Sequence, residues 1–118
     1  MSESADDATV VPEVDLGAFE AAWRDGATVL DVRNPDEYLQ KHVPGAVLVP
    51  LPELGERLDA VPAGRPLYVI CARGSRSRSA AEAMRLQLGW EVLNVTAGTE
   101  GWAESGRPLA AGTDPGER

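Results

Sequence analysis

Short apolar runs alternate with segments of helical periodicity along most of the chain. Runs rich in β-branched side chains and bounded by turn residues predict strands, and they cover residues 27–32, 46–51, 66–71 and 91–95. A fifth run over residues 9–14 contains Pro12. We expect it at the edge of a sheet, because proline cannot donate a hydrogen bond to a neighbouring strand.

The segments between these runs predict helices over residues 16–25, 35–42, 51–61, 79–89 and 98–106. In the first of them, Leu16, Phe19 and Trp23 recur at the spacing of one helical face. Gly55 interrupts the third segment, and Gly89 is expected to end the fourth. Nearly continuously apolar strands that alternate with helices predict an α/β fold with a mostly parallel sheet covered on both faces.

Length and composition are those of a globular domain. The chain has 118 residues, of which 43% are hydrophobic and 25% charged, enough for one domain with its own core. We expect this single domain over residues 10–110. The polar residues 1–9 are expected to form a disordered acidic tail, and residues 111–118 a flexible C-terminal tail.

Charge and cysteine content exclude several classes of function. A net charge of −8 argues against binding to nucleic acid or to an anionic membrane. Apolar runs stay well short of the ~20 residues of a membrane helix. The acidic N-terminus lacks the pattern of a secretory signal, so a cytoplasmic location is expected. The single cysteine, Cys71, allows no internal disulfide and no multi-cysteine metal site, and no metal or organic cofactor is expected.

The candidate chemistry lies in the stretch that follows this cysteine. Cys71 ends a predicted strand, and open parallel α/β sheets bind ligands at the carboxyl ends of their strands. A loop containing Gly74 and then a helix follow, so backbone N–H groups and the positive helix end are expected to lower the pKa of the thiol. Arg73, Arg76 and Arg78 add positive charge, which suits an anionic sulfur and an anionic substrate. The alternative, an inert buried cysteine, leaves this arginine-rich turn without a reason.

Four segments together resemble the rhodanese family of sulfurtransferase domains. They are CARGSRS over residues 71–77, DVRNPDEY over residues 31–38, HVPGA over residues 42–46, and the C-terminal pattern of Gly98, Trp102, Gly106 and Pro108. Ala97 departs from the family pattern, which has a glycine at that place. The resemblance covers residues 14–110 and implies a three-layer α/β/α fold with a five-stranded parallel sheet.

The resemblance also implies a mechanism. The Cys71 thiolate would take sulfane sulfur from thiosulfate or a related small anionic donor as a persulfide, and cyanide or a thiol would then remove it. Because the chain has no second cysteine, the acceptor thiol must be external, on a small molecule or a protein. Arg76 would stabilise the loop or the anionic sulfur, and the pair Asp31 and Arg33 would support the site. The persulfide would lie in the loop of Ala72, Arg73, Gly74, Ser75 and Ser77.

Several interpretations stay open at this point. Arg73 either contacts the anionic donor or points to solvent, and Ser77 either caps the helix or hydrogen-bonds the loop. The only histidine, His42, is expected to be structural. Related cysteine phosphatases place an arginine six positions after the cysteine, whereas Arg76 is five positions on, so phosphatase activity is not expected. The alternatives to a sulfurtransferase are a non-catalytic rhodanese-like binding or regulatory module, or a persulfide relay to a sulfur-carrier protein.

Overall fold

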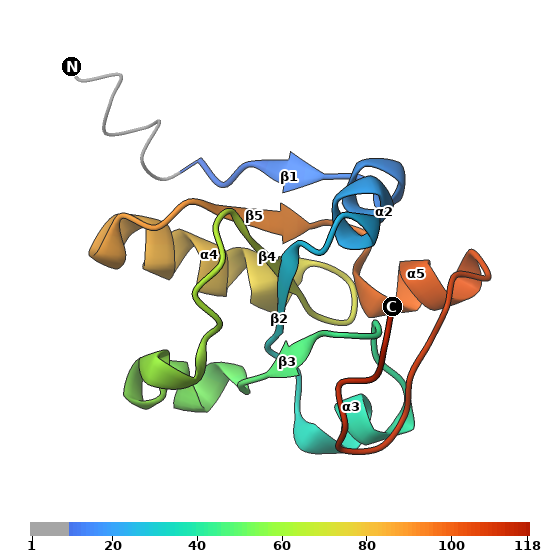
Figure 1. Ribbon diagram of the computed structural model, residues 1–118. Helices are drawn as coiled ribbons and strands as arrows, with labels where there is room; N and C mark the ends of the chain where they lie inside the picture. The colour runs from blue at the N-terminus through green and yellow to red at the C-terminus, as the bar shows by residue number, and fades with distance from the viewer. Residues whose placement is uncertain (1–9) are drawn as a thin grey trace.

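Five parallel strands form one sheet in the spatial order β1-β5-β4-β2-β3 (Figure 1). In this computed structural model, which describes residues 10–118, the strands are β1 (Glu13–Val14), β2 (Thr28–Asp31), β3 (Val47–Leu48), β4 (Leu67–Ile70) and β5 (Val92–Val95). The segment with the proline supplies the edge strand β1, as predicted. The acidic tail expected over residues 1–9 lies outside the described residues.

Helices follow most of the strands along the chain. They are α2 (Leu16–Arg24), α3 (Pro35–Gln40), α4 (Ser75–Leu88), α5 (Gly98–Glu104) and two 3₁₀ helices, η1 (Leu51–Glu56) and η2 (Leu58–Ala60). The 3₁₀ pair replaces the one helix expected over residues 51–61. Helix α4 begins at Ser75 instead of residue 79, because Gly74 takes a left-handed φ of 98° and turns the chain directly into the helix. Within residues 10–118, no helix is both long and apolar enough to cross a membrane.

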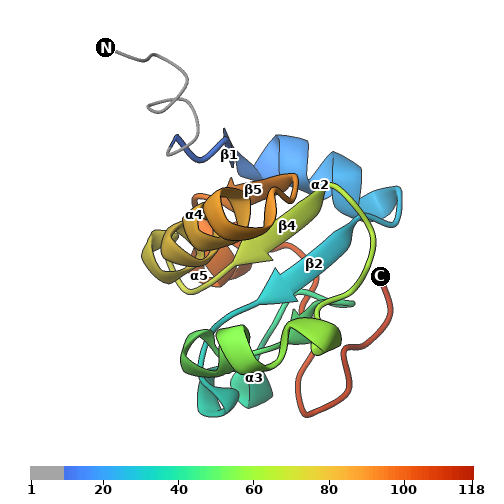
Figure 2. The ribbon, with the colours of Figure 1, turned by 90° about the vertical axis from the view of Figure 1, so that its left-hand side faces the viewer.

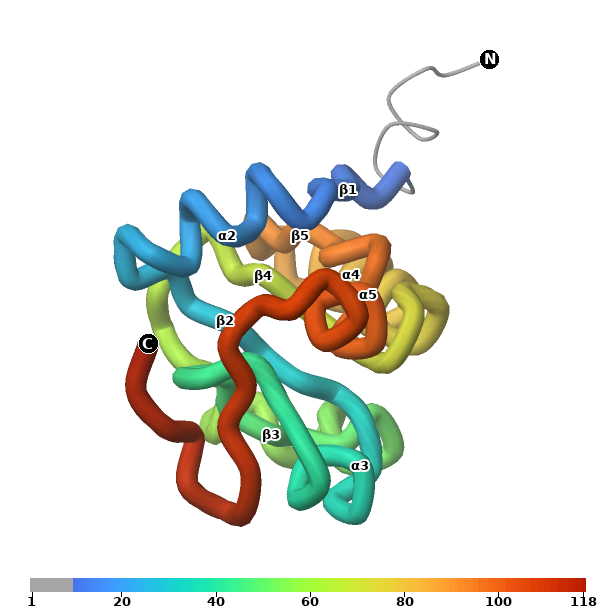
Figure 3. Tube along the Cα trace, turned by 90° about the vertical axis from the view of Figure 1, so that its right-hand side faces the viewer, coloured from blue at the N-terminus to red at the C-terminus, as the bar shows by residue number. Residues whose placement is uncertain are grey.

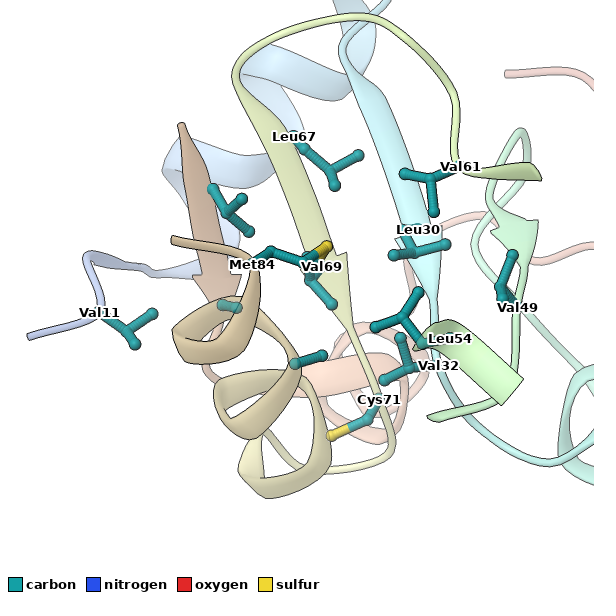
Figure 4. Packing of buried hydrophobic residues seen from close by; sticks show 13 residues of the cluster. Val11, Leu30, Val32, Val49, Leu54, Val61, Leu67, Val69, Cys71 and Met84 are labelled. Carbon is teal, nitrogen blue, oxygen red and sulfur yellow. The ribbon is translucent and has the colours of Figure 1, made fainter. Parts of the chain in front are cut away.

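Alternate side chains along the strands build a core on each face of the sheet, which gives three α/β/α layers (Figure 2). One face is covered by α4 and η1, and its core includes Leu30, Leu54, Leu67, Val69 and Met84 (Figure 4). The opposite face is covered by α2 and α5, and its core includes Phe19, Trp23, Val29, Ile70 and Trp102. Cys71 belongs to the first core, so its side chain lies on the side of the sheet that α4 covers.

The chain after α5 runs back across the domain to end near α2 (Figure 3). The backbone N–H of Gly45 donates to the Pro115 carbonyl at 2.8 Å, and the Arg118 guanidinium donates to the Trp23 carbonyl at 2.9 Å. The structure thus places residues 111–118, which the sequence predicts as a flexible tail, against the domain. The flexibility of this segment stays a prediction.

Candidate active site

Cys71 lies immediately after β4, at the carboxyl end of the middle strand of the sheet. Its residue is only 1% exposed, and Figure 4 shows its sulfur directed toward the first turns of α4. Asp31 ends the neighbouring strand β2 and pairs with Ile70, so Asp31 and Arg33 belong to the same end of the sheet as Cys71. This is the end where an open parallel sheet binds ligands.

Two glycines allow the loop Ala72–Gly74 to turn tightly around the sulfur. A Cβ atom at Gly74 would overlap the Thr96 carbonyl oxygen, and one at Gly98 would overlap the Ala72 carbonyl oxygen. Gly98 has a φ of 69°, a left-handed value that few other residues adopt. The loop is therefore held between β5 and the start of α5.

The backbone carbonyl groups of Cys71 and Ala72 are bound by the first turn of α5. The Thr99 N–H donates to the Cys71 carbonyl at 2.8 Å, and the Glu100 N–H donates to the Ala72 carbonyl at 3.0 Å. Because a peptide unit directs its C=O and N–H to opposite sides, this arrangement leaves the N–H groups of the loop free to face Cys71.

Hydrogen-bond donors converge on the Cys71 sulfur. The Gly74 N–H lies 3.1 Å from Sγ, and the Ser77 hydroxyl oxygen lies 3.2 Å from it. Burial acts to raise the pKa of Cys71, but hydrogen bonds from the Ser77 hydroxyl and from the backbone N–H groups of Ser77, Gly74 and Arg73 outweigh it, so the pKa is lowered from 9.0. The geometry favours a thiolate in a small cradle of donors. Of the two interpretations of Ser77, the structure supports hydrogen bonding within the loop, since Gly74 holds the cap position of α4.

The three arginines after Cys71 do not supply free positive charge, contrary to the expectation from the sequence. Each is paired with a glutamate from another element; the pairs are Arg73–Glu104 at 2.7 Å, Arg76–Glu37 at 2.8 Å and Arg78–Glu13 at 2.8 Å. Each charge is neutralised locally. The stabilisation of the anionic sulfur therefore comes mainly from the short-range N–H and O–H donors.

The three pairs differ in how firmly they hold. Arg76 and Glu37 form two parallel hydrogen bonds of 2.8 and 3.0 Å, and each side chain is about one-third exposed. Arg73 and Glu104 share one hydrogen bond, and both are more than 60% exposed. A bidentate, half-buried pair is more persistent than a single exposed contact. Arg76 is thus held more firmly by its partner than Arg73 is.

The buried pair of Asp31 and Arg33 fixes the segment that carries Glu37. The Arg33 guanidinium donates to Asp31 at 2.8 to 3.1 Å and to the Lys41 carbonyl at 2.8 Å, and both charged side chains are at most 1% exposed. Lys41 follows the last turn of α3. The pair therefore ties α3, and with it Glu37 and Arg76, to the end of β2.

Lowering the pH is expected to remove the contribution of the Glu37–Arg76 pair to stability. Hydrogen bonds from Arg76, opposed by partial burial, lower the pKa of Glu37 from 4.5 to about 2. A carboxyl whose pKa is lower in the folded state than in the unfolded state stabilises the fold at any pH above its unfolded-state pKa. This stabilisation is lost as the pH falls from about 4.5 toward about 2. In urea unfolding, the free-energy difference between wild type and Glu37→Gln should therefore shrink below pH 4.5.

The same comparison in an Arg76→Gln background serves as the control. Since Arg76 is the main cause of the lowered pKa, the Glu37→Gln difference should depend much less on pH in that background. If the stability difference between wild type and Glu37→Gln stays constant between about pH 4.5 and about 2, the result would contradict a stabilising Glu37–Arg76 pair.

Two roles in the site were not identified from the sequence. Asn94 of β5 is 1% exposed and contacts both Ser77 and the Gly74 carbonyl, and no motif within its strand marks it. Glu104 faces Arg73 from the end of α5, 31 residues away in sequence.

His42 has both ring nitrogens against backbone carbonyl oxygens, at 2.8 to 3.1 Å, which fits the structural role expected for it. Within residues 10–118, no group of three His, Cys, Asp or Glu side chains could hold a metal ion.

Comparisons with known proteins bear on the same region. Residues 17–105 match the family model of the rhodanese-like domain. A putative sulfur carrier protein of Bacillus subtilis is 36% identical over 84% of the chain, and the chain spans 55% of that relative's length. A thiosulfate sulfurtransferase, GlpE of Actinobacillus pleuropneumoniae, is 34% identical over 78% of the chain and 85% of its own length. The crystal structure of a rhodanese-related protein from Thermoplasma volcanium is 30% identical with a TM-score of 0.74, covering 84% of this chain and 97% of that one.

Proposed function

The chain belongs to the rhodanese-like domain family, and from this premise we propose that it is a sulfurtransferase in which Cys71 carries sulfane sulfur as a persulfide. The observation that carries the proposal is the set of donors at 3.1 and 3.2 Å around a buried sulfur whose pKa is lowered despite its burial. An inert core cysteine needs no such donors.

In the first half-reaction, the Cys71 thiolate attacks the outer sulfur of thiosulfate. A new S–S bond forms, the bond between the two thiosulfate sulfurs breaks, and sulfite leaves with the electron pair. The negative charge then lies on the outer sulfur of the persulfide, where the loop N–H groups stabilise it as an oxyanion hole stabilises oxygen. In the second half-reaction, cyanide or an external thiolate takes the outer sulfur, and Cys71 leaves as the thiolate.

A mass measurement tests the covalent step directly. After incubation with thiosulfate, the intact protein should gain ~32 Da, the mass of one sulfur atom, and cyanide should remove this gain. Thiosulfate, 3-mercaptopyruvate and a small-molecule persulfide should be compared as donors in parallel. No gain with any of these donors would support the binding-module alternative, whereas a gain only from the persulfide would favour a relay to a carrier protein.

Releasing Arg73 from Glu104 is expected to improve the binding of an anionic donor. We propose that thiosulfate contacts Arg73 and must then displace the Glu104 carboxylate from it, since the two are paired at 2.7 Å. Exposed pairs of this kind are weak. The Glu104→Gln variant should therefore lower KM for thiosulfate by roughly twofold to fivefold with little change in kcat. Steady-state formation of thiocyanate measures both constants.

Two further variants make this prediction specific. In an Arg73→Ala background, Glu104→Gln should leave KM unchanged, because the cation that it frees is gone. The matched control is Glu53→Gln on η1, which breaks an exposed pair with Arg57. If Glu53→Gln and Glu104→Gln lower KM equally, the effect is one of net charge and Arg73 is not the contact.

A further inference from the structure

Asn94 is a buried polar residue with contacts on three sides. Its Oδ1 atom lies 2.5 Å from the Ser77 hydroxyl oxygen, and its Nδ2 atom donates to the Gly74 carbonyl at 3.1 Å. Nδ2 also lies 3.3 Å from the carboxylate of Glu13 on β1. Ser77 and Gly74 are the residues whose O–H and N–H face the Cys71 sulfur, so Asn94 contacts both of these residues.

The Ser77 hydroxyl has two acceptors and only one proton. It lies 3.2 Å from the Cys71 sulfur and 2.5 Å from Asn94 Oδ1, and it can donate to only one of them at a time. A neutral thiol can donate to the Ser77 oxygen, which leaves the Ser77 proton for Asn94. A thiolate can only accept, so the Ser77 contact stabilises it only when the hydroxyl donates to the sulfur. Stabilisation of the thiolate by Ser77 therefore requires the hydroxyl to turn from Asn94 to the sulfur.

We propose that Asn94 is a positioning residue whose side-chain oxygen accepts the hydrogen bond of the Ser77 hydroxyl when the inner sulfur is uncharged. When that sulfur is a thiolate, the hydroxyl donates to the sulfur instead. The proposal rests on the proposed function in one respect: the persulfide is a second uncharged state of the inner sulfur. When the persulfide forms, the charge moves to the outer sulfur and the hydroxyl turns back to Asn94. When the acceptor removes the outer sulfur, the hydroxyl returns to the thiolate.

The amide acts on the sulfur in two opposing ways. Its Oδ1 atom competes for the Ser77 proton and so favours the uncharged sulfur. Its Nδ2 atom binds the Gly74 carbonyl and so holds in place the residue whose N–H faces the sulfur at 3.1 Å, which favours the thiolate. Only the first effect passes through Ser77. A double-mutant cycle between Asn94 and Ser77 separates the two effects.

The cycle compares Asn94→Ala, Ser77→Ala and the double variant by the pH midpoint of Cys71 alkylation with iodoacetamide. Ser77→Ala alone should raise the midpoint, because the thiolate loses a donor. In the Ser77→Ala background, Asn94→Ala should only raise the midpoint, because the competition for the Ser77 proton is already gone. In the wild-type background, the midpoint after Asn94→Ala should move upward less, or downward, and the two shifts should differ by about half a pH unit or more, the size expected for one hydrogen bond. Equal shifts in the two backgrounds would overturn the proposal.

Charged groups around the site are common to all corners of the cycle, so their effects cancel. They are Glu13 on β1, Arg76 and Arg78 on α4, and Glu37 on α3. Tyr38→Phe is the control for a lost buried hydrogen bond, since the Tyr38 hydroxyl binds the Ala46 carbonyl outside the Asn94 contacts. It should leave the alkylation midpoint unchanged.

A second variant and a measurement on the wild-type protein test the proposal if Asn94→Ala does not fold. Asn94→Leu fills the volume of the amide and should show the same coupling to Ser77. In addition, the side-chain carbonyl ¹³C resonance of Asn94 in the wild-type protein should shift with the Cys71 midpoint, and this shift should shrink in Ser77→Ala. A resonance that titrates identically in both proteins would also overturn the proposal. Alkylation does not require turnover, so these results stand apart from the persulfide measurement that tests the function.

Discussion

Cys71→Ser is expected to abolish sulfur transfer and to prevent any gain in mass with thiosulfate. A serine hydroxyl is not ionised at neutral pH and forms no persulfide, so the covalent route is closed. The rate of thiocyanate formation should fall by at least about a thousandfold, to the level of the reaction without enzyme. The fold should be retained, because serine is slightly smaller than cysteine and can accept the same hydrogen bonds from Gly74 and Ser77. Steady-state kinetics and intact mass, with circular dichroism for the fold, check all three statements.

The comparison of Cys71→Ser with Ser77→Ala shows whether the sulfur itself is required. Ser77→Ala keeps the nucleophile and the Gly74 N–H, so it should weaken transfer and still allow the mass gain. Thiocyanate formation that survives in Cys71→Ser would contradict a covalent intermediate. It would point to direct attack of cyanide on a bound donor.

The sequence predicted the fold well because its signals are local. Each buried strand is a short β-branched run between turn residues, so β2, β4 and β5 appear within two residues of their expected limits. The place of Cys71 at the carboxyl end of β4 follows from the strand alone. The loop was predicted as a cradle of N–H groups because a glycine between a strand and a helix permits little else.

The charge distribution of the site could not be predicted, because the pairs that set it are long-range. Arg76 meets Glu37 across 39 residues, and Arg78 meets Glu13 across 65. In the sequence, the arginines follow Cys71 directly, whereas their glutamates lie on α3, α5 and β1 and join them only in the folded sheet. Counting cations near the cysteine therefore took no account of the glutamates that pair with them.

Asn94 was missed for a related reason. A single asparagine in the strand VLNV gives no sign of its partner, and its role depends on β5 lying beside β4. That neighbour relation brings the amide within 2.5 Å of Ser77 and 3.1 Å of the Gly74 carbonyl. The order of strands in a parallel sheet cannot be derived from any single segment of the sequence.

Arg33→Met is expected to be the most destabilising single substitution among the variants considered for this site. It leaves the Asp31 carboxylate, which is 0% exposed, without its guanidinium partner, and it also frees the Lys41 carbonyl. Removing one partner of a buried pair costs about 3–5 kcal/mol, a large part of the stability of a small domain. Urea unfolding followed by circular dichroism should show this loss. Sulfur transfer should fall as well, because Arg33 ties α3, and thus the Glu37 that binds Arg76, to the sheet.

Two companions decide whether the loss comes from the uncompensated charge. Arg57→Met breaks an exposed pair with Glu53, in which both side chains are nearly half exposed, and should cost less than about 1 kcal/mol. The double variant Asp31→Leu with Arg33→Met removes both buried charges, so it should be more stable than Arg33→Met alone. If the double variant is instead less stable than Arg33→Met, the Asp31 carboxylate contributes to the fold without its partner. Asp31 would then stabilise the fold through the hydrogen bond that it accepts from the backbone N–H of Arg33 at 3.0 Å, and not through the compensation of charge.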